Sequence, residues 1–330
     1  MEKYLITGGA GFIGSNLAQE LVQRGHQVRV VDNFLTGKKE NIAFLLDKIE
    51  LIEGDIRDFK ICQQALAGVD FVLHQAALPS VPRSIEDPLL TSEININGTL
   101  NLLWASKEVS LKKFVFASSS SVYGDDPSLP KHEDMKPNPL SPYALTKLVG
   151  EFYCQIFSQI YRLPTISLRY FNVFGPRQSL SNPYTGVVAI FMSRIKNNNP
   201  PIVYEDGLQT RDFISVYDVV NANLLAMEKN SGNYQVFNVG SGNPITIKSI
   251  AETIAKLYGK NIKPNISGKF RKWDIRHCYA DISKIRDKLE FEVKTSFEED
   301  LKELISWSAK KKATDKFDIA TKELEERGLI

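Results

Sequence analysis

Short β-rich runs alternate with helical patterns through the first half of the chain, and this alternation limits the possible folds most strongly. We expect strands at residues 4–7, 27–31, 49–53, 71–75, 113–118 and 165–170. These runs are nearly continuously apolar, as strands buried on both faces are. Because helices of ordinary length separate them, the sequence predicts an α/β fold with a doubly wound parallel sheet.

The pattern changes after residue 175, where Pro, Asn and Gly cluster at 175–185 and again at 197–201. We therefore expect residues 1–175 to form the larger domain and residues 176–330 mainly a smaller C-terminal α/β domain. Segments near 211–216 and 235–239 should return to complete the first sheet. A long helix is expected at 140–161, and the tail from 296 to 330 should be helical and pack on the outside.

A glycine-rich turn, Thr7-Gly8-Gly9-Ala10-Gly11-Phe12-Ile13-Gly14, joins the first expected strand to the first helix. Glycines at this spacing allow a tight turn and close approach of a pyrophosphate, whose charge the helix N-terminus neutralises. Glycine-rich turns are common, but this position in the chain is typical of a Rossmann-type dinucleotide-binding domain.

Asp32 ends the second expected strand and is followed by Asn33. A carboxylate at this place accepts hydrogen bonds from an adenosine ribose and repels a 2′-phosphate, which favours NAD over NADP. Lys38 and Lys39 follow closely and could attract that phosphate, and Asp32 could instead be a turn or helix-cap residue. Together, the glycine turn and Asp32 predict an NAD site.

A run of serines at 118–121 precedes Tyr143 and Lys147, which are four residues apart in an expected helix and so share one face. A tyrosine pKa of about 10 is too high for a base near neutrality, but an ammonium or an oxidised nicotinamide nearby would lower it. Ser119 ends a parallel strand and could relay a hydrogen bond to a substrate hydroxyl. Tyr-x-x-x-Lys pairs also arise by chance, yet their order after the dinucleotide motif favours catalysis.

Composition excludes several other classes of function. The chain has 41 Lys and Arg against 39 Asp and Glu, a net charge of +2 that indicates no nucleic-acid surface. Three separated cysteines and four scattered histidines show no ligand spacing, so we expect no metal site. We expect no signal peptide before the first strand, and no apolar run in the sequence is long enough to cross a membrane. The expectation is a soluble, cytoplasmic protein.

The ordered motifs resemble the extended short-chain dehydrogenase/reductases, and within them the nucleotide-sugar 4-epimerases. The resemblance covers nearly the whole chain. Its carriers are residues 7–14, 32–33, 54–58, 74–77, 118–124, 143–147, 168–178, 209–213 and 274–281. Residues 78–84, 124–131 and 274–278 most resemble bacterial and archaeal UDP-N-acetylglucosamine 4-epimerases.

The resemblance implies NAD as cofactor, with Tyr143 as proton acceptor, Lys147 as its partner on the nicotinamide ribose and Ser119 as the family's serine or threonine. Asn95 would hold the active-site helix, and Asp55 with Ile56 would flank the adenine. The implied cofactor-binding residues are Gly8, Gly11, Phe12, Ile13, Gly14, Asp32, Asn33, Thr36, Gly37, Asp55, Ile56, Gln75, Ala76, Ala77, Asn95, Tyr143, Lys147 and Tyr170.

For the substrate, Asn172 would meet the sugar diphosphate, and Arg211 and Arg271 would bind its phosphates, because the guanidinium fork matches phosphate oxygens. The implied substrate-binding residues are Ser80, Arg83, Ser119, Ser120, Ser121, Tyr143, Asn172, Val187, Tyr204, Arg211, Arg271, Asp274 and Cys278.

Cys278 matches the family position that is regarded as the gatekeeper of the sugar pocket. A tyrosine there excludes N-acetylated sugars and a small residue admits them, although a buried thiol can equally be a core residue. Trp273 replaces the glycine that is common before Asp274, which puts the position of Arg271 and the fine specificity in doubt.

The implied reaction is reversible C4 epimerisation of a UDP-hexose through a 4-keto intermediate, with UDP-GlcNAc and UDP-GalNAc as expected substrates alongside UDP-glucose and UDP-galactose. No carboxylate lies between Ser119 and Tyr123, which argues against a dehydratase or decarboxylase. A dTDP-rhamnose-type 4-epimerase, a nucleotide-sugar dehydrogenase or reductase, and a non-catalytic NAD-binding regulator remain as alternatives. The regulator is disfavoured because it needs no tuned base.

Members of this family usually form homodimers through a four-helix bundle. Here the resemblance implies the helices near 91–108 and 141–161. Leu100, Leu103, Phe152 and Phe157 are expected on their outer faces, although each could equally belong to the core.

Overall fold

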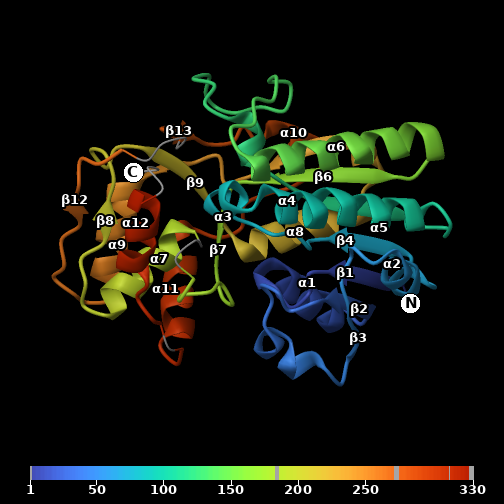
Figure 1. Cartoon of the computed structure of the whole chain (residues 1–330), viewed down its shortest axis with the longest axis horizontal. Coiled ribbons are helices and arrows are strands. Elements are labelled where there is room, and N and C mark those ends of the chain that lie inside the picture. Colours follow the sequence, from blue (N-terminus) through green and yellow to red (C-terminus); the bar gives the residue numbers. More distant parts are fainter. Residues whose placement is uncertain (1, 183–185, 271–274, 312, 327–330) are drawn as a thin grey trace.

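In the computed structural model, the described residues are 2–182, 186–270, 275–311 and 313–326. They form a larger lobe built on a sheet with helices on both faces and a smaller lobe beside it (Figure 1). Among the described residues, no helix has both the length and the apolar character needed to cross a membrane.

The larger lobe contains a seven-stranded sheet in the order β10-β6-β5-β4-β1-β2-β3, and all neighbouring strands are parallel. The strands are β1 (Lys3–Thr7), β2 (Gln27–Asp32), β3 (Ile49–Glu53), β4 (Phe71–His74), β5 (Lys113–Ser119), β6 (Thr165–Tyr170) and β10 (Gln235–Val239). The predicted doubly wound parallel fold is confirmed. The six strands expected in the first half of the chain each lie within one residue of the predicted bounds.

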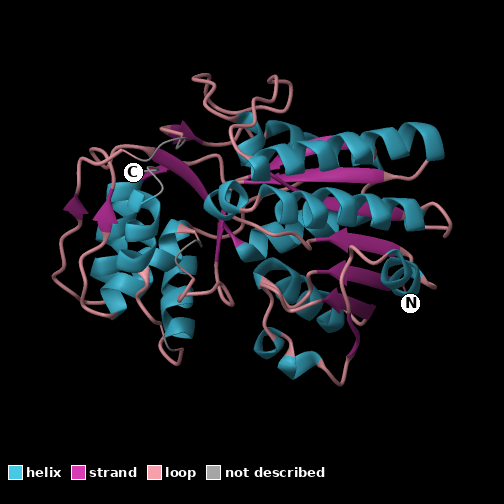
Figure 2. Cartoon of the chain, in the orientation of Figure 1, coloured by secondary structure: helices cyan, strands magenta, loops and turns pink. Residues whose placement is uncertain are grey.

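Helices cover both faces of this sheet, as Figure 2 shows. One face packs on α1 (Phe12–Gln23), α8 (Val216–Glu228) and α10 (Ser283–Leu289), and the other on α2 (Phe59–Leu66), α5 (Gly98–Ser106) and α6 (Pro142–Tyr161). Successive strand residues serve opposite cores, since Ile6 belongs to the first hydrophobic cluster and Leu5 to the second. Both faces of the sheet are therefore buried.

The helix expected at 91–108 consists of α4 (Pro88–Ser92), a π-helical segment (Glu93–Asn97) and α5. An outer face and the core were both left open for four residues of these helices, and the structure places Leu103 and Phe157 in the core against the sheet. Leu100 packs partly against the same core, whereas Phe152 is 52% exposed. The helical period alone could not tell which side of each helix met the sheet.

A second sheet lies at the junction of the lobes, with β9 (Thr210–Ser215) at its centre between β11 (Pro244–Thr246) and β13 (His277–Cys278). The short strand β7 (Asn172–Phe174) also pairs with β9. The prediction that residues near 211–216 complete the first sheet is wrong, because β9 pairs with these strands instead. The helix that follows β9, α8, starts at Val216 and returns to the larger lobe, where it packs on α1 and β5. The segment near 235–239 does join the first sheet, as its edge strand β10.

The smaller lobe is mainly helical. It contains α7 (Val187–Lys196), α9 (Ile247–Leu257), α11 (Phe297–Ser308) and α12 (Phe317–Glu326), with a parallel pair formed by β8 (Ile202–Val203) and β12 (Asn265–Ile266). Its core joins apolar residues of α7, α9 and α11 to Phe213 of β9. A capping box, in which Ser296 and Glu299 bond reciprocally, starts α11. A remaining short helix, α3 (Val81–Glu86), lies in the larger lobe against α6.

Candidate active site

A cavity of about 370 Å³ lies at the carboxyl edge of the seven-stranded sheet, where open α/β sheets bind ligands. It is lined by the glycine turn, the ends of β2 and β4, and residues of α6. Every expected cofactor-binding residue except Asn95 lines this cavity. The structure thus brings together residues that are far apart in the sequence.

At two positions of the glycine turn, neighbouring backbone leaves no room for a side chain. Gly8 has φ +67°, and a Cβ there would lie 2.8 Å from the backbone of Ala76. A Cβ on Gly14 would lie 2.8 Å from Cα of Gly9. Gly11 is the N-cap of α1 and carries no side chain to cap it, so the first N–H groups of the helix remain for an anion.

Asp32 is nearly buried at the end of β2. Its carboxylate accepts hydrogen bonds from N–H of Ala10 (2.9 Å) and of Phe34 (2.8 Å), while burial raises its pKa. A Cβ on Gly37 would lie 2.8 Å from both carboxylate oxygens, so glycine is needed there. The bond to Phe34 is that of a turn residue, yet Asp32 also lines the cavity, and the two roles are compatible.

The two lysines that could favour a 2′-phosphate are close to carboxylates. Lys39 Nζ lies 2.9 Å from Glu53, and Lys38 Nζ lies 3.8 Å from Glu40. Lys38 lines the cavity. Because each lysine lies near a carboxylate, its attraction for a 2′-phosphate is reduced. The two lysines therefore weaken the preference for NAD less than the sequence alone suggests.

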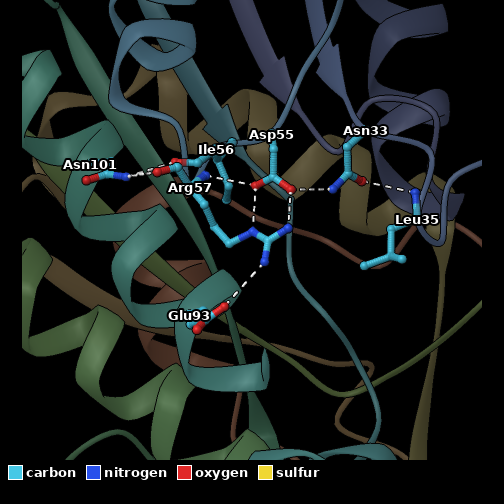
Figure 3. A network of polar contacts seen from close by, with 7 residues as sticks. All are labelled: Asn33, Leu35, Asp55, Ile56, Arg57, Glu93 and Asn101. Carbon is cyan, nitrogen blue, oxygen red and sulfur yellow. Dashed lines mark hydrogen bonds and ion pairs between the residues drawn. The ribbon is translucent and has the colours of Figure 1, made fainter. Parts of the chain in front are cut away.

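Asn33 and Asp55, which line the cavity, belong to a polar network that Figure 3 shows. Asn33 donates from Nδ2 to Asp55 (2.8 Å) and accepts from N–H of Leu35 (3.0 Å). Arg57 pairs with Asp55 at 2.8 Å and with Glu93 at 3.3 Å. Partial burial favours a raised pKa for Asp55, but these bonds outweigh it and its pKa lies below the ordinary value. Asp55 is therefore a fixed anion in the cavity wall, and half-exposed Leu35 lines the same cavity.

Tyr143 and Lys147 project from α6, whose first turn begins with Pro142 after the capping residue Ser141. Lys147 Nζ donates to the carbonyl of Ala117 at 2.8 Å and lies 5.9 Å from the centre of the Tyr143 ring. Burial lowers the pKa of Lys147 to about 8. Burial raises the pKa of Tyr143, and a hydrogen bond with Ser119 opposes that rise. The three expected catalytic residues are thus in one place.

The serines form a turn after β5. Ser119 Oγ accepts hydrogen bonds from the N–H (3.2 Å) and the hydroxyl (2.9 Å) of Ser121. Cys278 of β13 is buried, which raises its pKa, while a hydrogen bond with Ser120 opposes the rise. The small sheet therefore meets the serine turn through Cys278.

Three expected substrate-binding residues lie on adjacent strands of the small sheet. Asn172 of β7 pairs in register with Phe213 of β9, and Arg211 of β9 pairs in register with Cys278 of β13. Arg211 donates from Nη1 to the carbonyls of Thr210 (2.9 Å) and Arg276 (3.0 Å).

The other expected substrate residues are spread around this sheet. Ser80 caps α3 with φ +114°, and its Oγ accepts from N–H of Arg83 at 3.4 Å. Val187 begins α7, and Tyr204 follows β8. Arg271 and Asp274, together with Trp273, lie outside the described residues.

Asn95 was expected to bind the cofactor, but it does not line the cavity. It is buried in the π-helical segment, where it bonds to N–H of Leu78 (2.7 Å), the carbonyl of Leu78 (3.2 Å) and Thr146 Oγ1 (3.1 Å). Because Thr146 precedes Lys147, this contact fits the expected support of the active-site helix, while the loop around Leu78 separates Asn95 from the cavity.

A buried ion pair supports the same region. Glu151 accepts from Arg169 in two bonds of 2.9 and 2.8 Å and from the hydroxyl of Ser118 at 2.5 Å. Both charged side chains are only 4% exposed. Through these bonds Glu151 joins α6 to β5 and β6, next in sequence to Ser119 and on the same helix as Tyr143.

Comparison with known proteins agrees with this arrangement. The model of the family described as "NAD dependent epimerase/dehydratase family" matches residues 4–240. The chain belongs to this epimerase/dehydratase family. A putative UDP-glucose 4-epimerase of Methanocaldococcus jannaschii is 36% identical, over 92% of this chain and 97% of that protein.

Solved structures of epimerases are similar along almost the whole chain. The UDP-N-acetylglucosamine 4-epimerase of Methanobrevibacter ruminantium, in complex with UDP-N-acetylmuramic acid, has 39% identity and a TM-score of 0.89, covering 93% of this chain and 97% of that one. The UDP-glucose 4-epimerase of Thermus thermophilus, in complex with NAD, has 34% identity and a TM-score of 0.85, covering 93% and 99%. The resemblance to NAD-dependent epimerases is confirmed.

The cavity fits the cofactor of the epimerase/dehydratase family. Side chains at Gly8 and Gly14 would collide with neighbouring backbone, Gly11 leaves the start of α1 uncapped, and Asp32 and Asp55 line the same cavity. These residues would hold NAD, with the pyrophosphate at the helix N-terminus.

Sequence reasoning missed one wall of the cavity. The missed residues include Leu35, Asn41, Leu78, Ile94, Arg177, Gln178, Ser179, Asn182 and Gly186. Arg177 and Gln178 were part of the quoted motif at 168–178, but no physical pattern in that motif indicated that it reached the cofactor. Only the turn after β7, which leads back to α1, brings them there.

Replacing Lys147 by Met should change how stability depends on pH in the cofactor-free protein. Burial holds the Lys147 pKa near 8 against an ordinary 10.5, so the buried charge destabilises the folded protein below pH 8 and this penalty disappears as the pH rises to about 10.5. The stability of Lys147→Met relative to wild type should therefore fall by up to ~3 kcal/mol across that window. Urea unfolding at several pH values measures this. The exposed replacement Lys60→Met is the control, and a difference that stays constant for Lys147→Met would contradict the assignment.

Proposed function

We propose that this protein is an NAD-dependent 4-epimerase of UDP-hexoses, acting on UDP-GlcNAc and UDP-GalNAc and also on UDP-glucose and UDP-galactose. The observation that carries the proposal is that Tyr143 and Lys147 line the cavity whose glycine turn fits a dinucleotide, while Ser119 hydrogen-bonds to Tyr143. Similarity to UDP-sugar 4-epimerases over more than nine-tenths of the chain supports it.

Tyr143 is the proposed acid and base of the reaction. Its phenolate takes the proton of the sugar C4 hydroxyl, with Ser119 holding that hydroxyl by a hydrogen bond, and it later returns the proton to the 4-keto intermediate. Bound NAD supplies a reversible hydride acceptor beside C4. Burial raises the Tyr143 pKa in the cofactor-free protein, so positive charge from Lys147 and from the oxidised nicotinamide is needed to stabilise the phenolate.

Epimerisation requires the ketose to turn while its nucleotide stays fixed. Asn172 and Arg211, on neighbouring strands of the small sheet, are the proposed anchors of the diphosphate, together with Arg271. The pivot thus belongs to a different sheet from the catalytic residues, which lets the sugar rotate against a fixed base.

The serine turn argues against elimination chemistry. A 4,6-dehydratase or a decarboxylase of this type needs a carboxylate just after the catalytic serine. Here Ser120 and Ser121 follow Ser119, and both hydrogen-bond within the protein, to Cys278 and to Ser119 respectively. A proton at C5 or C6 therefore has no acceptor on this turn.

Cys278 is the proposed determinant of sugar size. It is packed in a small cluster with Val122, Phe171 and Ala280 and bonds to Ser120 beside the catalytic serine. A side chain that is both small and adjacent to the reacting region leaves volume for an N-acetyl group, whereas tyrosine would fill it.

The deciding experiment is an NMR assay of the purified protein with UDP-GlcNAc and, separately, UDP-glucose, without added cofactor. We expect UDP-GalNAc and UDP-galactose to form without net NADH. Tyr143→Phe should lower the rate about 10²- to 10⁴-fold while the protein keeps its NAD, because only proton transfer is lost. Failure to convert either sugar would reject the proposed substrates and direct the test to dTDP-rhamnose; release of NADH would indicate a dehydrogenase.

Cys278→Tyr should separate the two kinds of sugar. Turnover of UDP-GlcNAc should fall by a factor of roughly 10 to 100 relative to UDP-glucose, since the ring occupies the space of the acetamido group. The control Cys278→Ala should convert both, and thermal unfolding verifies that each variant is folded. Equal losses for the two sugars in Cys278→Tyr would show that Cys278 is only a core residue.

We also propose that the protein forms a homodimer through α4, α5 and α6. Phe152, Ile156 and Ile160 form an exposed apolar stripe along α6, with exposed fractions of 52%, 44% and 65%. Leu89 of α4 and Trp104 of α5 are exposed on the helices packed beside it. Apolar surface of this extent is typical of an interface, and a second copy would bury it in a four-helix bundle.

Phe152→Asp should break the dimer, because it places a charge in that stripe. Light scattering should give twice 37.2 kDa for the wild type and 37.2 kDa for the variant. Ile319→Asp changes another exposed apolar residue, on α12, and should leave the mass unchanged. A wild type of monomer mass would refute the interface.

A further inference from the structure

Arg177 lines the cofactor cavity from the second half of the chain. It lies in the turn after β7, where Gly175 and Arg177 itself have positive φ values of +147° and +73°. From there its guanidinium reaches back to α1, donating to Gln19 Oε1 at 2.7 Å and to Asn16 Oδ1. Asn16 in turn donates to the carbonyl of Pro176 at 3.2 Å. The turn is thus fastened to the helix that starts at the glycine motif.

The charge of Arg177 has no compensating anion among the described residues. Both side chains that accept its hydrogen bonds are neutral amides, and the guanidinium also lies 5.6 Å from the centre of the Phe44 ring. Among the described residues no carboxylate forms an ion pair with it. Its Nε is buried without an acceptor, and burial lowers its pKa. A partly buried cation without a counterion is costly, so a chain that keeps one in a cavity wall has a use for it as a ligand site.

The other cations of the cavity wall have either a carboxylate nearby or a place at the catalytic end. Lys38 lies near Glu40, whereas Lys147 donates to the carbonyl of Ala117 and lies beside the Tyr143 ring. The carboxylates of Asp32 and Asp55 also have protein partners. Arg177 has neither a carboxylate nor a place beside Tyr143, and it shares the cavity with the uncapped start of α1.

We infer that Arg177 binds the diphosphate of the dinucleotide and so fastens the turn after β7 across the bound cofactor. This inference rests on the NAD site of the proposed function but not on the identity of the sugar. A guanidinium offers paired donors that match phosphate oxygens, and the positive N-terminus of α1 acts on the same group. Because Asn16 and Gln19 already hold Arg177 in place, little side-chain entropy is lost on binding.

The consequence is retention of the cofactor between turnovers. A dinucleotide held only by the glycine turn and the strand ends could leave along the open edge of the sheet. With Arg177 across its diphosphate, departure requires breaking this charged contact as well as the bonds that fasten the turn to α1. An epimerase needs such retention, because the hydride must return to the same sugar.

The first measurement is the NAD content of the purified protein, together with binding of ADP-ribose and of adenosine to protein stripped of NAD. Arg177→Met should carry less NAD through purification and bind ADP-ribose about 10- to 100-fold more weakly, with unchanged affinity for adenosine. Arg177→Lys keeps the positive charge but lacks the paired donors of the guanidinium. Its affinity for ADP-ribose should lie between those of the wild type and Arg177→Met. The control is Arg24→Met. Arg24 is an exposed arginine at the C-terminal cap of α1 and pairs with Glu20, so this variant should bind ADP-ribose and adenosine as the wild type does.

The outcomes distinguish the role of Arg177 from the NAD site and from the proposed reaction. If Arg177→Met weakens the binding of ADP-ribose and of adenosine equally, Arg177 is a structural residue and the inference is overturned. A lower thermal midpoint of the NAD-free variant would accompany that outcome. Unchanged ADP-ribose affinity in Arg177→Met would overturn the inference as well. Failure of the wild type itself to bind ADP-ribose would overturn both the NAD site and the inference, whereas absence of sugar turnover with normal ADP-ribose binding would overturn only the proposed reaction.

Discussion

The buried ion pair between Glu151 and Arg169 is the interaction on which the geometry of the active site depends. Glu151 lies on the same helix as Tyr143 and Lys147, and Arg169 directly precedes Tyr170 at the end of β6. Since Ser118 also bonds to Glu151, one carboxylate sets the distance between the strand that ends in the serine turn and the helix that carries the base. Losing either partner would leave a buried charge uncompensated, which is why such a pair fixes a single arrangement of its neighbours.

The residues that could be predicted are those whose physical requirement is local. Apolar runs separated by helices determine a parallel sheet, and the expected strands of the first half differ from the observed ones by no more than one residue at either end. The glycine turn and the acidic end of β2 are also local, because they depend on backbone clearance at Gly8 and Gly14 and on the carboxylate of Asp32. Tyr143 and Lys147 follow from helical spacing once the order of the motifs is known.

What could not be predicted depends on contacts between distant segments. The apolar residues Phe213 and Ile214 are compatible with a strand of either sheet, but only the pairing of β9 with β7, β11 and β13 shows that it belongs to the second sheet. The helical period likewise does not show that Leu103 faces the core while Phe152 faces outward. Arg177 reaches the cavity only because a turn with positive φ leads the chain back to α1, and no spacing in the sequence encodes that path.

The position of β10 at the edge of the large sheet has a consequence for how the protein is made. Its partner β6 ends at residue 170, but β10 begins at residue 235, so during synthesis the sheet stays one strand short until the chain through β9 and α8 has left the ribosome. Until then β6 exposes a full row of backbone donors and acceptors, which invites pairing with another nascent chain. The larger lobe is therefore not an autonomous N-terminal unit: a fragment that stopped at residue 175 would lack both its edge strand and two of the helices that cover it.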